Sequence, residues 1–135
     1  MSVRVFTVEE ANRLLPEVEG ELRWFQDSVR RIVATQDAIS VREMLGGDRP
    51  GSPEYRELSH LRAQLDEAAE QYNARLESFT RYGCVIKNLE IGLVDFYGRK
   101  DGRLVFLCWR MGEPSVRYWH EIDGGFGARR PVEEL

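Results

Sequence analysis

Apolar residues recur at three- and four-residue steps along the first third of the chain, which is the spacing of one face of an α-helix. This pattern predicts a helix over residues 8–45, started by a capping box in which Thr7 is followed by Glu10. We expect a kink or a restart near Pro16, because proline lacks a backbone donor and clashes with the preceding turn. The stripe consists of Ala11, Leu14, Leu15, Val18, Leu22, Phe25, Val29, Ile32 and Val33.

A second apolar stripe has nearly heptad spacing and predicts a helix over residues 53–82 that packs antiparallel to the first. Ser52-Pro53 is typical of a helix start, and Gly83 is typical of a helix end. At 1.5 Å per residue such a helix is about 45 Å long, which exceeds what a small sheet covers. We therefore expect a long helical hairpin that packs on itself or on another copy. The stripe consists of Leu58, Leu61, Leu65, Ala68, Tyr72, Leu76 and Phe79.

After Gly83 the period of the pattern changes to that of β-strands. Residues 84–122 are rich in β-forming side chains, and Asp101-Gly102 is typical of a tight hairpin turn. We expect three or four antiparallel strands in a meander, followed by a glycine-rich, irregular tail over residues 123–135. The chain is therefore predicted to be an α+β protein with a single domain over residues 1–135.

The hairpin turn also predicts which residues face each other. If Asp101-Gly102 is a two-residue turn, Asp95 lies opposite Cys108, and a loop at 112–114 places Tyr118 beside Cys108. A four-residue loop at 111–114 would exchange the faces of the last strand. One face of the sheet then carries Asp95, Cys108 and His120, and the other carries Phe96, Leu107, Trp109 and Trp119.

The Trp-bearing face would leave large apolar side chains exposed, and such patches usually mark an interface. We therefore expect a homo-oligomer, most simply a two-fold dimer. The alternative is that the N-terminal strand or the glycine-rich tail covers this face.

Three side chains on the other face are candidate metal ligands. The carboxylate of Asp95, the thiolate of Cys108 and the imidazole of His120 suit zinc or another divalent transition metal, with one position open for water. An enzyme that uses such a site requires the three groups to converge within about 4 Å in a cleft, and it is ruled out if they are dispersed or buried among apolar side chains. No HExxH or CxxC motif supports it. The alternative is an ordinary core, with His120 bonded to Asp95 or to the backbone.

Charge and composition limit the classes of function that this protein can have. The formal net charge of -4 argues against a general DNA or RNA binder, which relies on clustered basic residues. The sequence contains no apolar window long enough for a bilayer and no signal-peptide core. We expect a cytoplasmic protein in which Cys84 and Cys108 are reduced, although a bridge between them stays open.

Three segments resemble the bacterial domain-of-unknown-function 2203 family over nearly the whole chain. They are FTVEEANRLLPEV at 6–18, GCVIKNLEIGLVDF at 83–96 and LCWRMGEPSVRYWHEIDGGFGAR at 107–129. The resemblance implies a small cytosolic bacterial protein without an established activity, and it supplies no catalytic residues. The third segment, which carries most of the resemblance, contains Trp109, Glu113, Trp119, His120, Glu121 and Asp123.

Two functional hypotheses follow. The first is a non-enzymatic, self-associating interaction or regulatory module whose contact surfaces are the helical hairpin and the Trp-bearing face. Its ligand-binding or interface residues would be Trp109, Glu113, Trp119, Glu121 and Asp123. The alternative is a small metal-dependent or ligand-binding enzyme of the hydrolase type, with its site in residues 108–123 and one of these acids as acid–base group. The sequence leaves open whether the protein is an enzyme, and what its substrate would be.

Overall fold

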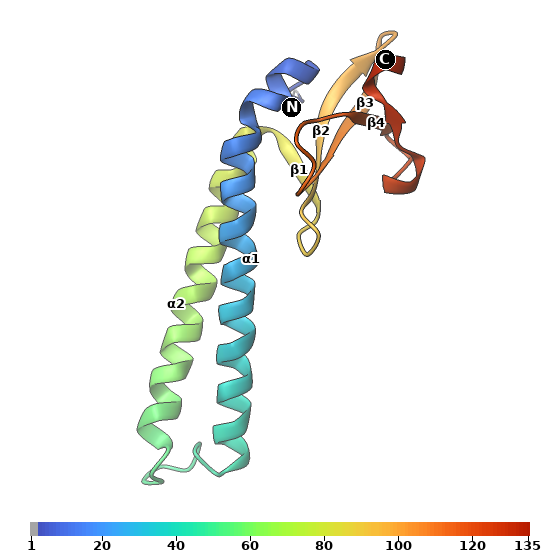
Figure 1. Cartoon of the computed structure of the whole chain (residues 1–135). Coiled ribbons are helices and arrows are strands. Elements are labelled where there is room, and N and C mark those ends of the chain that lie inside the picture. The colour runs from blue at the N-terminus through green and yellow to red at the C-terminus, as the bar shows by residue number, and fades with distance from the viewer. Residues whose placement is uncertain (1–2) are drawn as a thin grey trace. The chain divides into compact units, whose positions relative to one another are not determined.

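The computed structural model describes residues 3–135, which form two long helices followed by an antiparallel sheet (Figure 1). The predicted α+β class and the order of its elements are confirmed. The helices are α1 (Val8–Met44) and α2 (Tyr55–Phe79), the latter extended by the 3₁₀ turn η1 (Thr80–Tyr82). The strands are β1 (Cys84–Asn88), β2 (Leu93–Lys100), β3 (Arg103–Arg110), β4 (Tyr118–Glu121) and β5 (Arg130–Pro131).

These elements divide between two compact units. One contains the described residues up to Arg23 together with Phe79–Leu135, and the other is Trp24–Ser78. The first unit holds the sheet and the start of α1, and the second is a helical hairpin. Among residues 3–135, no helix is both long enough and apolar enough to cross a membrane.

The predicted start of α1 is confirmed as a capping box. The backbone N–H of Glu10 donates to Thr7 Oγ1 at 3.1 Å, and the N–H of Thr7 donates to Glu10 Oε1 at 2.8 Å. The hydrogen bond from the Thr7 backbone is the main reason why the pKa of Glu10 lies below its ordinary value. α1 includes Pro16 within one helix, so a restart at that position is wrong, whereas the expected kink stays a prediction. Buried packing on both sides of the proline, at Leu15 and Val18, stabilises the continuous helix.

In the unit Trp24–Ser78, the two helices run antiparallel, as predicted. The ring of Tyr72 lies 5.2 Å from that of Phe25 and 6.5 Å from that of Trp24. Near the connecting loop, Arg42 pairs with Glu57. Contacts at both ends of the hairpin therefore fix its direction.

The start of α2 differs from the prediction. The helix begins at Tyr55 rather than at Pro53. The hydroxyl of Ser52 donates to the backbone carbonyl of Gly47 at 3.2 Å, so it stabilises the loop and is not used as the helix cap. At the other end Gly83 adopts φ 78°, the left-handed conformation expected of a helix-ending glycine.

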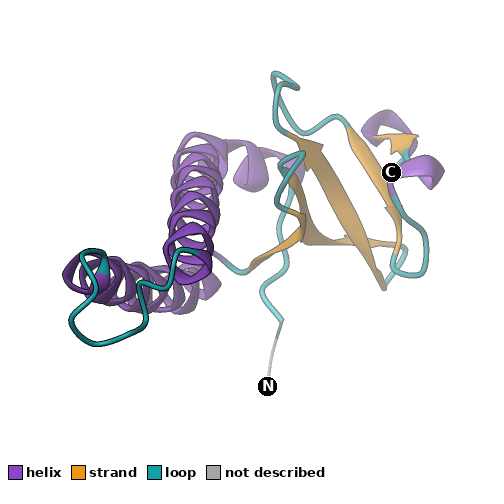
Figure 2. Ribbon diagram, turned by 90° about the horizontal axis from the view of Figure 1, so that it is seen from below, coloured by secondary structure: helices purple, strands orange, loops and turns teal. Residues whose placement is uncertain are grey.

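The five strands form one meander with the order β1-β2-β3-β4-β5 (Figure 2). Asp101 and Gly102 have φ angles of 50° and 80°, as a tight hairpin turn requires. Asp95 pairs with Cys108, and Cys108 pairs with Tyr118, so the predicted register is confirmed. The tail was expected to be irregular, but its residues Arg130–Pro131 pair with β4 and add a fifth strand.

The Trp-bearing face of the sheet is buried, and the prediction that it is exposed was wrong. Its residues Phe96, Leu107, Trp109 and Trp119 are at most 2% exposed. The ring of Phe6 lies 5.1 Å from that of Phe96, and Leu15 of α1 lines the same cavity as Trp109. The N-terminal segment and the first turns of α1 therefore cover the face that we expected to form an oligomer interface.

One side chain of α1 ties the helix to the loop before β4. Asn12 Oδ1 accepts the backbone N–H of Val116 at 2.7 Å, and Val116 itself is buried. We predict that Asn12→Ala lowers the free energy of unfolding by about 1–3 kcal/mol, because a buried donor loses its acceptor. Chemical denaturation measures this change. Asn12→Asp keeps an acceptor and should lose less, and Asn73→Ala, on the exposed side of α2, is the matched control. Equal losses in all three variants would contradict this account.

Candidate functional site

The three side chains proposed as metal ligands converge on one face of the sheet. Asp95 lies on β2, Cys108 on β3 and His120 on β4, the three central strands. Their candidate ligand atoms all lie within 4.8 Å of one another. The side chains are at most 3% exposed, so they form a buried cluster rather than the wall of an open cleft. We call these three residues the buried cluster.

Hydrogen bonding fixes the tautomer of His120. Its Nδ1 lies 2.7 Å from the backbone oxygen of Glu121, and a carbonyl only accepts, so Nδ1 carries the proton. In a neutral imidazole Nε2 is then an acceptor. Nε2 lies 3.1 Å from Oδ2 of Asp95, and an ionised carboxylate is also only an acceptor. Two acceptors thus face each other in a buried position, and they require a cation between them, either an additional proton or a metal ion.

The second carboxylate oxygen of Asp95 is also short of a partner. Oδ1 is buried and makes no hydrogen bond within residues 3–135. An unpartnered buried oxygen is costly, since it has lost its hydration without compensation. A bound cation would compensate this oxygen as well.

The Cys108 thiol is held in its protonated form. Burial is the main cause, and the charge of the nearby Asp95 carboxylate adds to it, so that the pKa of Cys108 rises to about 12. A thiol with this pKa is a poor nucleophile near neutral pH, because the thiolate is the reactive form. The arrangement does not support Cys108 and His120 as a nucleophilic catalytic pair. A divalent cation would instead displace the thiol proton on binding.

The edge of the buried cluster carries an arginine from the tail. The guanidinium of Arg129 lies 3.9 Å from the ring centre of Tyr118, which pairs directly with Cys108. Arg129 also donates to Glu113 Oε2 at 2.5 Å. Glu113 therefore neutralises the arginine and ties the tail to the loop between β3 and β4.

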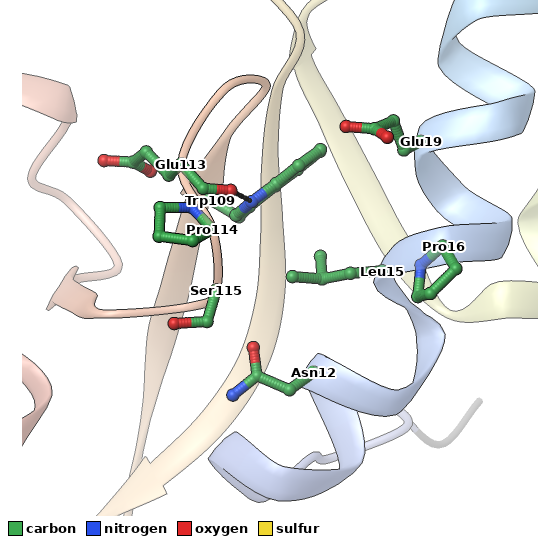
Figure 3. A pocket seen from close by; sticks show the side chains of 8 residues that line it. All are labelled: Asn12, Leu15, Pro16, Glu19, Trp109, Glu113, Pro114 and Ser115. Carbon is green, nitrogen blue, oxygen red and sulfur yellow. Dashed lines mark hydrogen bonds between the residues drawn. The ribbon is translucent and has the colours of Figure 1, made fainter.

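A separate cavity of about 280 Å³ lies between the start of α1 and the loop between β3 and β4 (Figure 3). Trp109 Nε1 donates to the backbone oxygen of Glu113 at 2.9 Å, which fixes the indole in the wall. Trp109 and Glu113, two of the predicted ligand-binding or interface residues, both line this cavity. Its other walls come from Asn12, Leu15, Pro16, Glu19, Pro114 and Ser115.

The remaining predicted site residues lie elsewhere. Glu121 accepts two hydrogen bonds from Arg103, at 3.0 and 2.6 Å, and this pairing lowers the pKa of Glu121. Trp119 is buried, and Asp123 is exposed in the turn after β4. The structure therefore does not gather the five predicted ligand-binding or interface residues into one site.

The two cysteines are not bridged within the described chain. Cys84 pairs with Phe96, whereas Cys108 pairs with Asp95, so the thiols lie on opposite faces of the sheet. The open possibility of a disulfide is thereby excluded. Burial raises the pKa of Cys84 to about 12 as well, which makes it a matched reference for Cys108.

Two contributions were missed by reasoning from the sequence. Asn12 and Glu19 of α1 line the cavity together with Trp109 of β3 and with the loop that follows it, although these segments are far from α1 in the sequence. Arg129 comes from a glycine-rich tail without a periodic pattern. The only available signal for Asn12 was a polar residue beside the apolar stripe, which is common on helices.

Comparison with known proteins places the chain in a family. The profile of a family described as "Uncharacterized conserved protein (DUF2203)" matches residues 4–132. The chain belongs to this family, as the three segments had indicated. No curated protein and no solved structure matches the chain.

The state of the thiols gives a prediction for the metal-free protein. At about pH 8 both cysteines should react slowly with a thiol reagent, because each is buried and has a pKa of about 12. Both should react rapidly after denaturation. Asp95→Asn removes the nearby negative charge, so it should lower the pKa of Cys108 and speed its labelling relative to Cys84. Rapid labelling of Cys108 in the native wild type would contradict this account.

Proposed function

We propose that this member of the DUF2203 family binds a divalent transition metal, with zinc as the first candidate, through Asp95, Cys108 and His120. The observation that carries the proposal is the pair of facing acceptors, His120 Nε2 and Asp95 Oδ2, 3.1 Å apart in a buried position. A metal ion replaces the additional proton that this pair otherwise needs. It also supplies a partner for Asp95 Oδ1, which has none within residues 3–135.

The ligand chemistry and the spacing suit zinc. Carboxylate, thiolate and imidazole are all zinc ligands, and at bond lengths of about 2.0–2.3 Å the ligands of a tetrahedral ion lie roughly 3.3–3.7 Å apart. The present separations, up to 4.8 Å, need only small side-chain rotations to reach those values. The hydrogen bond from His120 Nδ1 to a backbone carbonyl is the usual outer support of a metal-bound histidine.

The burial of the cluster bears on the role of the ion. Three protein ligands leave a fourth position, which a water molecule or a small anion can fill. Side chains with at most 3% exposure leave little access for a substrate. The proposal is therefore metal binding with a structural or regulatory role, and the hydrolase alternative needs an opening to the cluster.

Metal binding is tested by titrating the purified protein with Zn²⁺, and with Co²⁺ as a spectroscopic substitute. We predict one ion per chain, and a thiolate-to-cobalt charge-transfer band in the near ultraviolet. Cys108→Ser and His120→Ala should weaken binding by more than the roughly 10–100-fold that the loss of an outer partner costs.

Cys84→Ser is the matched control, because Cys84 is equally shielded but lies on the other face of the sheet. It should bind zinc and give the cobalt band like the wild type. If Cys84→Ser and Cys108→Ser behave alike, or if the wild type takes up no metal, the proposal fails.

The raised thiol pKa predicts how zinc affinity depends on pH. The metal-free protein keeps the Cys108 proton until about pH 12, so each metal bound near neutral pH releases at least that proton. The apparent affinity should therefore rise about tenfold or more per pH unit between about pH 6 and pH 8. Calorimetry in buffers of different ionisation enthalpy measures the released protons. An affinity that does not change with pH would contradict thiolate ligation.

A second candidate function is self-association through the helical hairpin. Val29, Val33 and Val41 of α1 are 38–51% exposed and fall within about a third of the helix circumference at 3.6 residues per turn. In the same unit, Leu76 of α2 is 40% exposed. Two helices alone leave this stripe uncovered, and a second copy of the hairpin is a partner with the same apolar face.

Light scattering over a range of concentrations tests this second function. We predict a dimer that Val33→Glu dissociates, because a charge would be buried in the shared face. Gln64→Glu, at an exposed polar position of α2 away from the apolar stripe of that helix, should leave the dimer intact. A wild-type protein that stays monomeric at high concentration would rule out self-association while leaving metal binding unaffected.

A further inference from the structure

We infer that the cavity between the start of α1 and the loop between β3 and β4 binds a small organic cation of the alkylammonium class. This inference does not depend on the metal proposal, because the cavity is lined by Trp109, whereas the buried cluster lies on the other face of the same strands.

The charge of the cavity selects a cation. Among the described residues that line it, the ionisable side chains are Glu19 and Glu113. The carboxylate of Glu113 is used by Arg129 and by the backbone N–H of Arg110, and Figure 3 shows it pointing away from Trp109. The carboxylate of Glu19 points from α1 toward the indole. Glu19 is therefore the anionic anchor.

Glu19 is available to a ligand. Its carboxylate forms an ion pair with Arg23, one helical turn further on, at 3.9 Å, and the Arg23 side chain is 64% exposed. An exposed pair of this length contributes little and is easily exchanged. A ligand ammonium group in the cavity would approach the same carboxylate from the side that faces Trp109, where less water competes.

The remaining walls suit a short apolar chain. Pro16 and Pro114 contribute apolar surface, together with the small parts of Leu15 and of the Trp109 indole that reach the cavity. The volume of about 280 Å³ lies at the lower end of small-molecule sites. A compact amine of a few carbon atoms fits this description better than a nucleotide or a peptide.

Three ligands of one size and different charge test the inference. We would titrate the protein with n-butylammonium, n-butanol and butyrate, and follow the Trp109 Nε1–H resonance by NMR. The expected result is saturable binding of n-butylammonium, at least about tenfold weaker binding of n-butanol, and no saturable binding of butyrate. Equal binding of n-butanol, or binding of butyrate, would overturn the inference.

Two glutamates on the same helix give the matched variants. Glu19→Gln keeps the shape of the side chain and removes its charge, and should weaken n-butylammonium binding about tenfold. Glu17→Gln, which is exposed and does not line the cavity, should bind like the wild type. Wild-type affinity in Glu19→Gln, or the same loss in both variants, would also overturn the inference. Failure here leaves the metal proposal untouched.

Discussion

The register between β2 and β3 is the constraint on which the buried cluster depends. The two-residue turn at Asp101-Gly102 sets this register, and it places Asp95 directly opposite Cys108. Side chains alternate between the two faces of a strand, so a slip by one residue would move Asp95 to the side that α1 covers. The pairing of β3 with β4 then adds His120 on the same face. A local turn thus determines a site assembled from three strands.

The chemistry of the buried cluster follows from the exclusion of solvent from its three side chains. In water, a carboxylate and a neutral imidazole nitrogen 3.1 Å apart would each be hydrated, but here both are buried. The same burial keeps the proton on Cys108. A metal ion resolves these conditions together, since it pairs with the carboxylate, uses the free lone pair of His120 and exchanges for the thiol proton. An additional proton would satisfy the His120–Asp95 pair but would leave Asp95 Oδ1 without a partner among the described residues, which is why we favour a metal over an ordinary core.

Local patterns were sufficient to predict much of this fold, and long-range packing was not. The capping box at Thr7, the glycine at 83 and the Asp101-Gly102 turn each depend on neighbouring residues, and each prediction was confirmed. Alternation along the strands then placed the three cluster residues on one face. By contrast, nothing in the apolar stripe of α1 shows that its first turns pack on the sheet, which is why Trp109 was expected to be exposed. The strand at Arg130–Pro131 was missed because two residues carry no period.

The most direct test of the metal site is X-ray absorption spectroscopy of the zinc-loaded protein. The account predicts one sulfur at about 2.3 Å and nitrogen or oxygen ligands at about 2.0–2.2 Å, with the sulfur retained in Cys84→Ser and lost in Cys108→Ser. A zinc ion surrounded only by nitrogen and oxygen, unchanged by Cys108→Ser, would place the metal elsewhere and contradict the account.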